Sequence, residues 1–369
     1  MIHKSLILQK AFLYNLYTDL FAESYGWGLS MELRKLQKIK GGSFTLSVPK
    51  EWVEKRKLKS GEQIAVSEEE DGSLRLFPVG MPFEKRLEVT LAFEDYPSLR
   101  ALEYCIGTYY IQGSNKIDVV SRKIIPAEHK KRLKLLRMEL PGVEVAEEEA
   151  NRLGFQVLID PAVFSLEGLI EKTSSFSLRL QEDAVKSVLE RDFQLAAEVM
   201  ERSREALRHY RMTVRQVALS SLSKSIAKKV GVRNCQECVT FALVARDLNR
   251  LVYHASSIAR HVLGLERKGK IDQGILDIVF DMSRVTYEMQ KGAVQAFLKK
   301  DVRLAIATMG EMEKVREKEK QLLTNVMKKM KDVDTAVVLG IIARDLRRIA
   351  GYAVAIADDA MNRVLTPIA

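Results

Sequence analysis

A cluster of basic side chains near the front of the chain is the feature best suited to bind another molecule. Between residues 31 and 60, nine lysines and arginines stand against three glutamates, and nine minus three leaves a local charge of +6. Such side chains bind phosphates because each neutralised phosphate releases a condensed counterion. We expect this stretch to contact DNA; the alternative is a solvated basic face on a module that only dimerises. The expected DNA contacts are Arg34, Lys35, Lys38, Lys40 and Lys50.

No catalytic centre can be assembled from the sequence. No serine or cysteine can be nominated together with a base and an orienting acid, so we expect neither enzyme activity nor a cofactor. Cys235 and Cys238 lack a second pair or a nearby histidine at zinc spacing, which favours a structural pair of thiols. His209, His254 and His261 stand alone on expected helices.

A short charged string, Ala-Arg-Asp-Leu-x-Arg, occurs twice, at 245–250 and at 343–348. Its aspartates could touch a ligand or a partner protein. We favour the alternative, in which each aspartate pairs with the arginine at the next turn or with a neighbouring helix. The charged residues of the two strings are Arg246, Asp247, Arg250, Arg344, Asp345 and Arg348.

Length and composition describe a multidomain globular protein. The 369 residues suggest two or three domains, and 47% hydrophobic with 29% charged residues is ordinary for a folded chain. Three cysteines are too few for a disulfide framework, which favours a reducing compartment and hence the cytoplasm. No stretch approaches the roughly 20 apolar residues that cross a bilayer, so we expect no membrane insertion. The net charge of +10 permits an anionic partner without identifying it.

Residues 1–80 divide into an extension and a small β-rich module. Residues 1–30 are interrupted by charges and read as neither a signal peptide nor a membrane span. Because the module begins at Met31, we expect this extension to be dispensable or to result from a misassigned upstream start. Within 31–80 we expect a strand over 44–48, a short helix after Pro49, and a hairpin of 64–66 with 74–77 around Asp71-Gly72. So small a core favours intertwining with a second copy.

Residues 84–162 read as a small α/β domain. We expect strands near 86–91, 116–120 and 155–159, and helices near 98–110 and 127–138. This pattern is that of a sandwich in which helices cover one face of a sheet.

Residues 166–265 and 271–366 read as two copies of one three-helix unit. Their helical patterns superpose, and the aspartates at Asp192 and Asp301 are one matched pair. The third helices match through the two charged strings, and we expect a longer connection around 228–234 to absorb the difference in spacing. The matched residues of the first helices are Ala184, Val185, Leu189, Leu195, Ala196 and Met200 with Ala293, Val294, Leu298, Leu304, Ala305 and Met309.

The front module resembles a known family. The string RKLQKIKGGSFTLSVPKEWV from Arg34 to Val53, closed by Leu58 to Glu62, resembles the AbrB/SpoVT swapped-hairpin family, especially the version in front of archaeal PhoU-like proteins. The resemblance implies a homodimer of interleaved hairpins that presents its basic residues to DNA.

The helical repeats resemble the PhoU family, whose third helices carry the same charged string and whose members act in the control of phosphate uptake. The resemblance would also place an acidic pair for a metal cluster on each third helix. This chain has Asn249 and Tyr253 there in the first copy, and Arg347 and Gly351 in the second. A cation site is disfavoured beside a fixed cation, so we expect no metal.

Together these features predict an α+β chain: a swapped-hairpin module, a small α/β module and a duplicated three-helix PhoU-type bundle. The leading hypothesis is a homodimeric, DNA-binding transcriptional regulator of phosphate uptake and homeostasis. The alternative is an adaptor that never touches DNA, whose repeats dock on a phosphate transporter ATPase or a signalling kinase.

Overall fold

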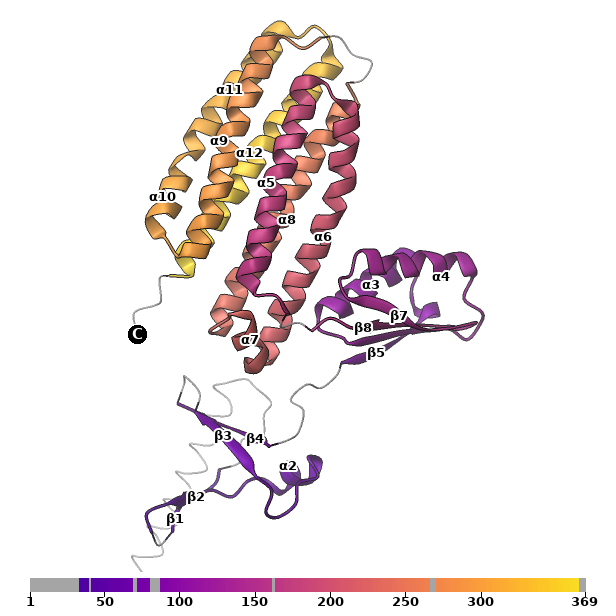
Figure 1. Ribbon diagram of the computed structural model, residues 1–369, viewed down its shortest axis with the longest axis vertical. Coiled ribbons are helices and arrows are strands. Elements are labelled where there is room, and N and C mark those ends of the chain that lie inside the picture. Colours follow the sequence, from indigo (N-terminus) through magenta and orange to yellow (C-terminus); the bar gives the residue numbers. More distant parts are fainter. Residues whose placement is uncertain are drawn as a thin grey trace, which may run out of the picture. The chain divides into compact units, whose positions relative to one another are not determined.

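The computed structural model describes residues 33–39, 41–68, 72–79, 87–160, 163–265 and 270–364. It divides into two compact units, Met1–Pro82 and Phe83–Ala369 (Figure 1). The extension expected at 1–30, the side chain of Lys40 and the turn residue Asp71 lie outside the described residues.

The front unit contains two separate antiparallel strand pairs and one short helix. Strand β1 (Gln37–Lys38) pairs with β2 (Phe44–Thr45), and β3 (Ile64–Glu68) pairs with β4 (Leu74–Pro78). The second pair and α2 (Lys50–Lys55) confirm the expected hairpin and helix. The strand expected over 44–48 is shorter, because β1 offers it only two partner residues before the chain turns.

This unit has almost no interior of its own. Among its described residues only Pro78 is buried. Eight large apolar side chains are between 48% and 65% exposed, and a folded chain leaves that much apolar surface in water only at a cost. The unit described alone is therefore an incomplete fold. These side chains are Leu33, Leu36, Ile39, Phe44, Leu46, Val66, Leu74 and Val79.

The α/β domain is a four-stranded sheet in the order β5-β6-β8-β7, with α3 and α4 on one face (Figure 1). Strands β5 and β6 are parallel and the other pairs are antiparallel. The three expected strands and two helices are confirmed. The elements are β5 (Glu88–Ala92), η1 (Phe93–Asp95), α3 (Leu99–Ile111), β6 (Lys116–Val120), α4 (Ala127–Lys134), η2 (Leu135–Met138), β7 (Val143–Glu149) and β8 (Arg152–Val157).

Strand β7 was not expected from the sequence. Its run Val-Glu-Val-Ala-Glu-Glu-Glu is rich in glutamate, a residue depleted in strands. The strand lies at the edge of the sheet, where it pairs only with β8 and exposes its charged side chains. Glutamates at an edge also discourage pairing with another chain. The position at the sheet edge therefore outweighs the low strand propensity of glutamate.

A buried arginine fixes the α/β domain to the helical bundle. Arg215 of α6 (Phe193–Leu222) is 2% exposed and donates to the carbonyl oxygens of Tyr110 and Ser114, and to Asn115 Oδ1 at 3.0 Å. Its guanidinium also lies 4.8 Å from the centre of the Tyr110 ring. One carbonyl lies in the last turn of α3 and the other in the loop after it, so the arginine joins the α/β domain to the bundle.

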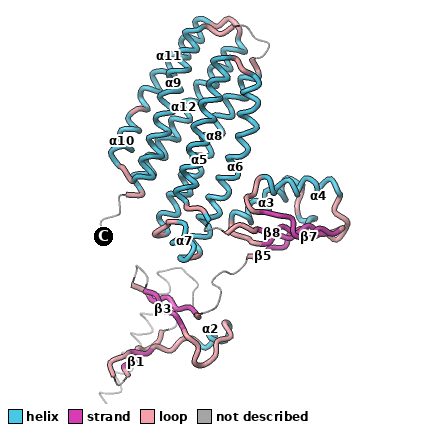
Figure 2. The backbone as a smooth tube through the Cα atoms, viewed as in Figure 1, coloured by secondary structure: helices cyan, strands magenta, loops and turns pink. Residues whose placement is uncertain are grey.

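From Leu166 onward the chain is helical (Figure 2). One continuous core of buried side chains runs through both repeats. None of the helices among the described residues is long and apolar enough to span a bilayer. The helices are α5 (Leu166–Glu190), α6, α7 (Lys224–Val230) and α8 (Cys235–Leu263), then α9 (Gln273–Lys299), α10 (Val302–Gly310), α11 (Met312–Lys329) and α12 (Val333–Asn362).

The duplication is visible in the corner that joins the first two helices of each repeat. Arg191 and Lys300 end α5 and α9 in the left-handed region, at φ 56° and 57°. Asp192 then caps α6 by accepting from Leu195 N at 2.9 Å, and Asp301 caps α10 in the same way. The matched aspartates of the sequence thus build the same turn twice.

The repeats differ in their middle and third helices. In the second repeat the middle helix is divided into α10 and α11 at Glu311, whereas α6 is continuous and is followed by α7. The connection expected at 228–234 is partly helical, because α7 continues to Val230 before Gly231 ends it at φ 87°. The charged strings lie within α8 and α12, because each helix begins about three turns earlier than the string.

Candidate functional site

The third helices of the two repeats, α8 and α12, pack against each other at a polar seam. His254 and Tyr352 hold equivalent positions, each about two turns after the repeated aspartate. Their rings stack with centroids 5.7 Å apart and planes 28° from parallel. Equivalent residues of the two copies therefore meet each other at the centre of this seam.

The repeated aspartates are buried within the seam. Asp345 is fully buried; its Oδ1 accepts from Arg344 at 3.2 Å and lies 3.1 Å from His254 Nδ1 on the facing helix. Burial opposes its ionisation, but hydrogen bonds from His254, Ser257 and Arg344 keep the pKa of Asp345 below its usual value. In the first copy Asp247 Oδ1 accepts from Arg246 Nε at 2.9 Å.

These contacts correct two sequence expectations. The aspartates bond the arginines directly before them, Arg246 and Arg344, and not those at the next turn, Arg250 and Arg348. His254 is not isolated, because it supplies the neighbouring-helix partner of Asp345. The expected pairing with a neighbouring helix is thus found for Asp345, which contacts His254 of α8, whereas Asp247 bonds Arg246 of its own helix.

A third carboxyl, Asp359 of α12, lies close to Asp247 and is 6% exposed. Burial, together with the negative charges of Asp247 and Asp358, raises the pKa of Asp359 to about 7. No group of three or more histidine, cysteine, aspartate or glutamate residues within the described ranges is placed to hold a metal ion. The absence of a metal remains a prediction from the sequence.

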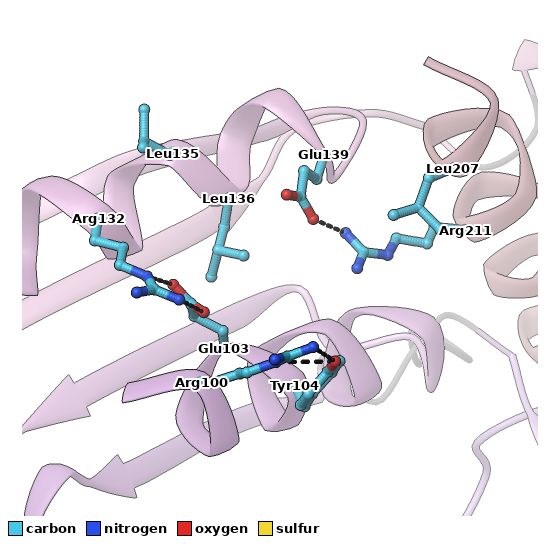
Figure 3. Close-up of a pocket in the computed structure, with 9 residues that line it drawn as sticks. All are labelled: Arg100, Glu103, Tyr104, Arg132, Leu135, Leu136, Glu139, Leu207 and Arg211. Carbon is cyan, nitrogen blue, oxygen red and sulfur yellow. Dashed lines mark hydrogen bonds and ion pairs between the residues drawn. The ribbon is translucent and has the colours of Figure 1, made fainter. Parts of the chain in front are cut away.

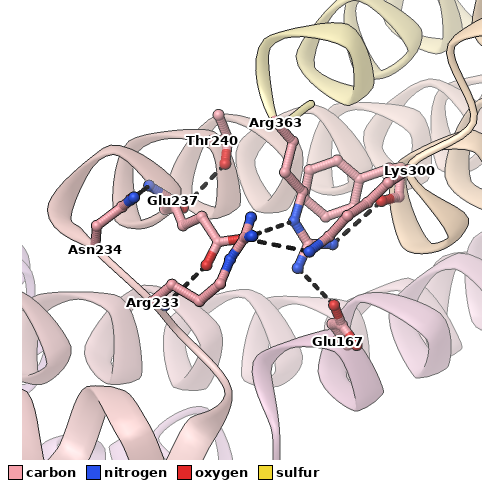
Figure 4. A network of polar contacts seen from close by, with 8 residues as sticks. Glu167, Arg233, Asn234, Glu237, Thr240, Lys300 and Arg363 are labelled. Atoms are coloured by element: carbon pink, nitrogen blue, oxygen red, sulfur yellow. Dashed lines mark hydrogen bonds and ion pairs between the residues drawn. The ribbon is translucent and has the colours of Figure 1, made fainter. Parts of the chain in front are cut away.

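Arg363, just beyond α12, joins the two repeats at one end of the bundle (Figure 4). Its side chain is 1% exposed, and its guanidinium packs against the rings of both Phe241 in α8 and Phe297 in α9, 4.7 and 4.8 Å from their centres. The guanidinium donates to Phe297 O, to Glu237 and to Glu167 of α5. One cation thus binds three helices that are far apart in sequence.

Glu237 is the main acceptor in this network. The pKa of Glu237 is lowered to about 2. Burial alone would raise this pKa, but hydrogen bonds from the side chain and backbone N–H of Arg233, together with the charge of Arg363, lower it by more. Lys300 adds a contact at 3.8 Å. Asn234 caps α8 by accepting from Glu237 N at 2.9 Å. Glu237 thus takes part in the cap at the start of α8 and also binds the second repeat.

The polar groups of the α8–α12 seam and of the Arg363 network hold the helices of the bundle together. Asp247, Asp345, Glu237 and Arg363 are buried, and the contacts of Asp345 with His254 and of Glu237 with Arg363 cross the boundary between the repeats. The thiols offer no alternative: Cys238 is buried, Cys235 is exposed, and both are free. Burial raises the pKa of Cys238, which suppresses its thiolate. A ligand or partner of this part of the chain is therefore expected to meet the outer surface of the bundle.

The expected DNA contacts lie in the front unit. Lys38 is in β1, Arg34 and Lys35 precede it, and all three are exposed. Lys50 begins α2 and lies 3.5 Å from Glu54 one turn later. Lys40 falls outside the described residues. The structure thus brings three of the five residues onto one short segment and leaves Lys50 on a separate element.

Several residues of the polar clusters were missed from the sequence. The pattern Asn234-x-x-Glu237 before an apolar run is a capping signal and could have identified the start of α8 and one end of the network. Nothing local marks Arg363 or Asp359, because their partners are distant in the chain. They become visible only when α12 is placed between α8 and α9.

Removing the Asp359 carboxyl should change how stability depends on pH. Because its folded pKa of about 7 lies above the ordinary value of 3.8, its stabilising contribution is complete below 3.8 and is lost as pH rises through 7. Asp359→Asn should therefore gain stability relative to the parent chain from about pH 5 to about pH 8, at up to about 1.4 kcal/mol per pH unit below 7. Urea unfolding at both pH values measures this.

Glu317→Gln, which removes an exposed carboxylate from α11, is the control and should give a difference from the parent chain that does not vary with pH. The raised pKa of Asp359 is contradicted if Asp359→Asn, like the control, changes the free energy of unfolding by the same amount at both pH values.

Comparison with known proteins finds a matching domain family for the helical part of the chain. The family model of the PhoU domain matches twice, at residues 170–262 and 279–360, which fall on α5–α8 and α9–α12. None of the curated proteins matches the chain.

Two solved structures are similar to the chain. One is the phosphate transport system regulatory protein PhoU from Streptococcus pneumoniae, with 16% identity and a TM-score of 0.45, covering 53% of this chain and 91% of that one. The other is PhoU from Pseudomonas aeruginosa, with 20% identity and a TM-score of 0.48, covering 53% and 93%. The two matches to the PhoU domain both fall in the helical part of the chain, which therefore resembles a tandem pair of PhoU domains.

Proposed function

We propose that this chain is a non-enzymatic, cytoplasmic regulator of phosphate transport that acts by docking on a partner protein, the ATPase of a phosphate transporter or a signalling kinase. The observation that carries the proposal is the pair of matches to the PhoU domain, which fall in one bundle. A solved PhoU protein is described as a regulatory protein of the phosphate transport system. The buried charges of the bundle support a docking role, since they are used in holding the repeats together.

An apolar patch on the second repeat fits a protein partner. Met327 on α11 and Val333 on α12 are 81% and 72% exposed, and they flank the turn between these helices. Leu323 and Val337 lie one turn further along each helix and are 39% and 55% exposed. Lys328, Lys329 and Lys331 surround the turn. An apolar centre with a basic rim is complementary to an acidic-rimmed protein surface.

The front unit supports homodimerisation through interleaved hairpins. Among its described residues, eight apolar side chains are exposed and one residue is buried, so the two strand pairs have no core within that part of the chain. A second copy that interleaves its own strands would supply this core. Dimerisation would also present the patch of the second repeat twice, which raises the avidity for a partner that is itself two-fold symmetric.

DNA binding by the front unit is the second candidate function. It is favoured by the exposed Arg34, Lys35 and Lys38 on one short segment. A dimer would present each of these residues twice and so could meet two phosphate backbones. The two functions are compatible, because they use different parts of the chain.

The docking proposal is tested with the purified ATPase subunit of the host's phosphate transporter and with a candidate phosphate-responsive kinase. Biolayer interferometry should show saturable binding of the full chain to one of them. Met327→Asp together with Val333→Asp should weaken it about tenfold or more, since a charge placed in an apolar contact costs more than 1.4 kcal/mol.

Ile124→Asp is the matched control, because Ile124 is 75% exposed on the α/β domain, and it should leave the affinity unchanged. Binding to neither protein by a dimeric, folded chain would overturn the docking proposal.

DNA binding predicts a steep dependence on salt. Each phosphate contact contributes about 0.9 to the slope of log affinity against log salt, so Lys38→Ala should lower the slope by about 1.8 if both copies touch DNA and by about 0.9 if one does. Fluorescence anisotropy with a duplex from the chain's own upstream region measures the slope.

The matched control is the triple alanine variant at Arg284, Lys291 and Lys299 of α9, which removes the same charges from the bundle and should leave the slope unchanged. If the triple alanine variant at Arg34, Lys35 and Lys38 remains dimeric and keeps the parent slope, the basic segment is not a DNA surface.

A further inference from the structure

A cavity of about 360 Å³ opens where the α/β domain meets the helical bundle (Figure 3). Its volume lies at the lower end of the range of small-molecule sites. The walls come from α3, from α4 with η2, and from α6, so an occupant would touch both parts of the second unit. The lining residues are Arg100, Glu103, Tyr104, Arg132, Leu135, Leu136, Glu139, Leu207 and Arg211.

The cavity has more positive than negative charge, three arginines against two glutamates. Two of the arginines are bound to carboxylates. Arg132 forms a fork with Glu103 at 2.6 and 2.9 Å, and Arg211 of α6 donates to Glu139 at 2.7 Å across the boundary between the α/β domain and the bundle. These pairs leave the third guanidinium as the excess charge.

That third guanidinium, Arg100, is bound only to a neutral group. Its Nε and one terminal nitrogen donate to the phenol oxygen of Tyr104 at 3.2 and 3.0 Å. Within the described residues it has no carboxylate partner. A guanidinium offers five donors in a planar fork, which matches two oxygens of a phosphate. Arg100 is thus placed to receive an anion.

The remainder of the cavity is apolar and aromatic. Leu136 is buried at its floor, and Leu207 of α6 lies on the opposite wall (Figure 3). The Tyr104 side chain is 59% exposed although the Arg100 guanidinium lies 5.5 Å from its ring centre. An exposed tyrosine ring beside leucines suits a flat aromatic group, because such rings stack in offset geometry.

A second group on α6 adds to the positive field. Arg208, one turn before Arg211, donates to the carbonyl oxygen of Met138 at 2.9 Å, next to Glu139. Glu139 is half exposed, so it can turn into water and free Arg211 for a ligand. Release of Arg211 from Glu139 would give an anion on Arg100 a second cation that lines the same cavity, and would loosen the contact between the α/β domain and the bundle.

We propose that this cavity binds a small phosphorylated molecule with a planar ring, of the size of a nucleoside monophosphate. Its phosphate is received by Arg100 with support from Arg211, and its ring lies against Tyr104. The ligand would connect the α/β domain to the bundle, so the domain serves as an effector module. This inference does not depend on the docking or DNA-binding proposals.

Isothermal titration calorimetry of the full chain tests the site with three probes: adenosine monophosphate, inorganic phosphate and adenosine. The nucleotide should bind saturably, and each fragment should bind at least about tenfold more weakly. Arg100→Ala should weaken nucleotide binding about tenfold or more, as loss of a charge-assisted hydrogen bond does. Tyr104→Leu should weaken the nucleotide more than inorganic phosphate, because it removes the ring as well as the phenol oxygen that holds Arg100.

The matched control is Arg284→Ala, an exposed arginine of α9, which should bind the nucleotide like the parent chain. Circular dichroism confirms that each variant is folded. Failure of the nucleotide to bind saturably at millimolar concentration overturns the proposal. So does nucleotide binding that Arg100→Ala leaves unchanged, or binding of inorganic phosphate as tight as that of the nucleotide. Each result is read without a partner protein or DNA, and is therefore separate from the fate of the proposed function.

Discussion

The buried guanidinium of Arg363 is the interaction on which the arrangement of the two repeats depends. It follows the last helix, packs against both Phe241 of one repeat and Phe297 of the other, and bonds Glu237 at the start of α8. A charge this deeply buried is stable only while its partners stay in place, because an unpaired ion inside a protein is strongly destabilising. The ends of both repeats must therefore come together for either to be complete.

Because buried polar groups hold the helices together, they also limit where a ligand or partner can bind. At the α8–α12 seam the repeated aspartates are engaged by Arg246, Arg344 and His254. Where the PhoU resemblance would place acids for a metal cluster, the chain has residues such as Asn249 and Arg347. Interior charge thus holds the repeats together, and the proposed recognition sites all lie at surfaces: an apolar patch on the second repeat, a basic segment at the front and a cavity on the α/β domain.

Much of this fold could be predicted from local pattern, and the parts that could not share a physical reason. The hairpin of β3 and β4, strand β6 and the duplicated corner at Asp192 and Asp301 follow from turn residues, periodicity and caps. Strand β7 and the partners of Asp345 depend on which element lies alongside, which one-dimensional pattern does not contain. The same holds for the cavity, since α3 and α6 are far apart in sequence. The DNA contacts rest on composition and resemblance, and remain predictions.

A double-mutant cycle on Glu237→Gln and Arg363→Met tests the central claim, that one buried ion pair joins the repeats. The free energies of unfolding of the parent chain, both single variants and the double variant would be measured in urea by helical circular dichroism. The account predicts that the single losses together exceed the loss in the double variant by about 1.5–3 kcal/mol, because each single change leaves the other group buried without its charged partner across the repeat boundary. Losses that add to within about 0.5 kcal/mol would contradict it, because the two groups would then contribute to stability independently.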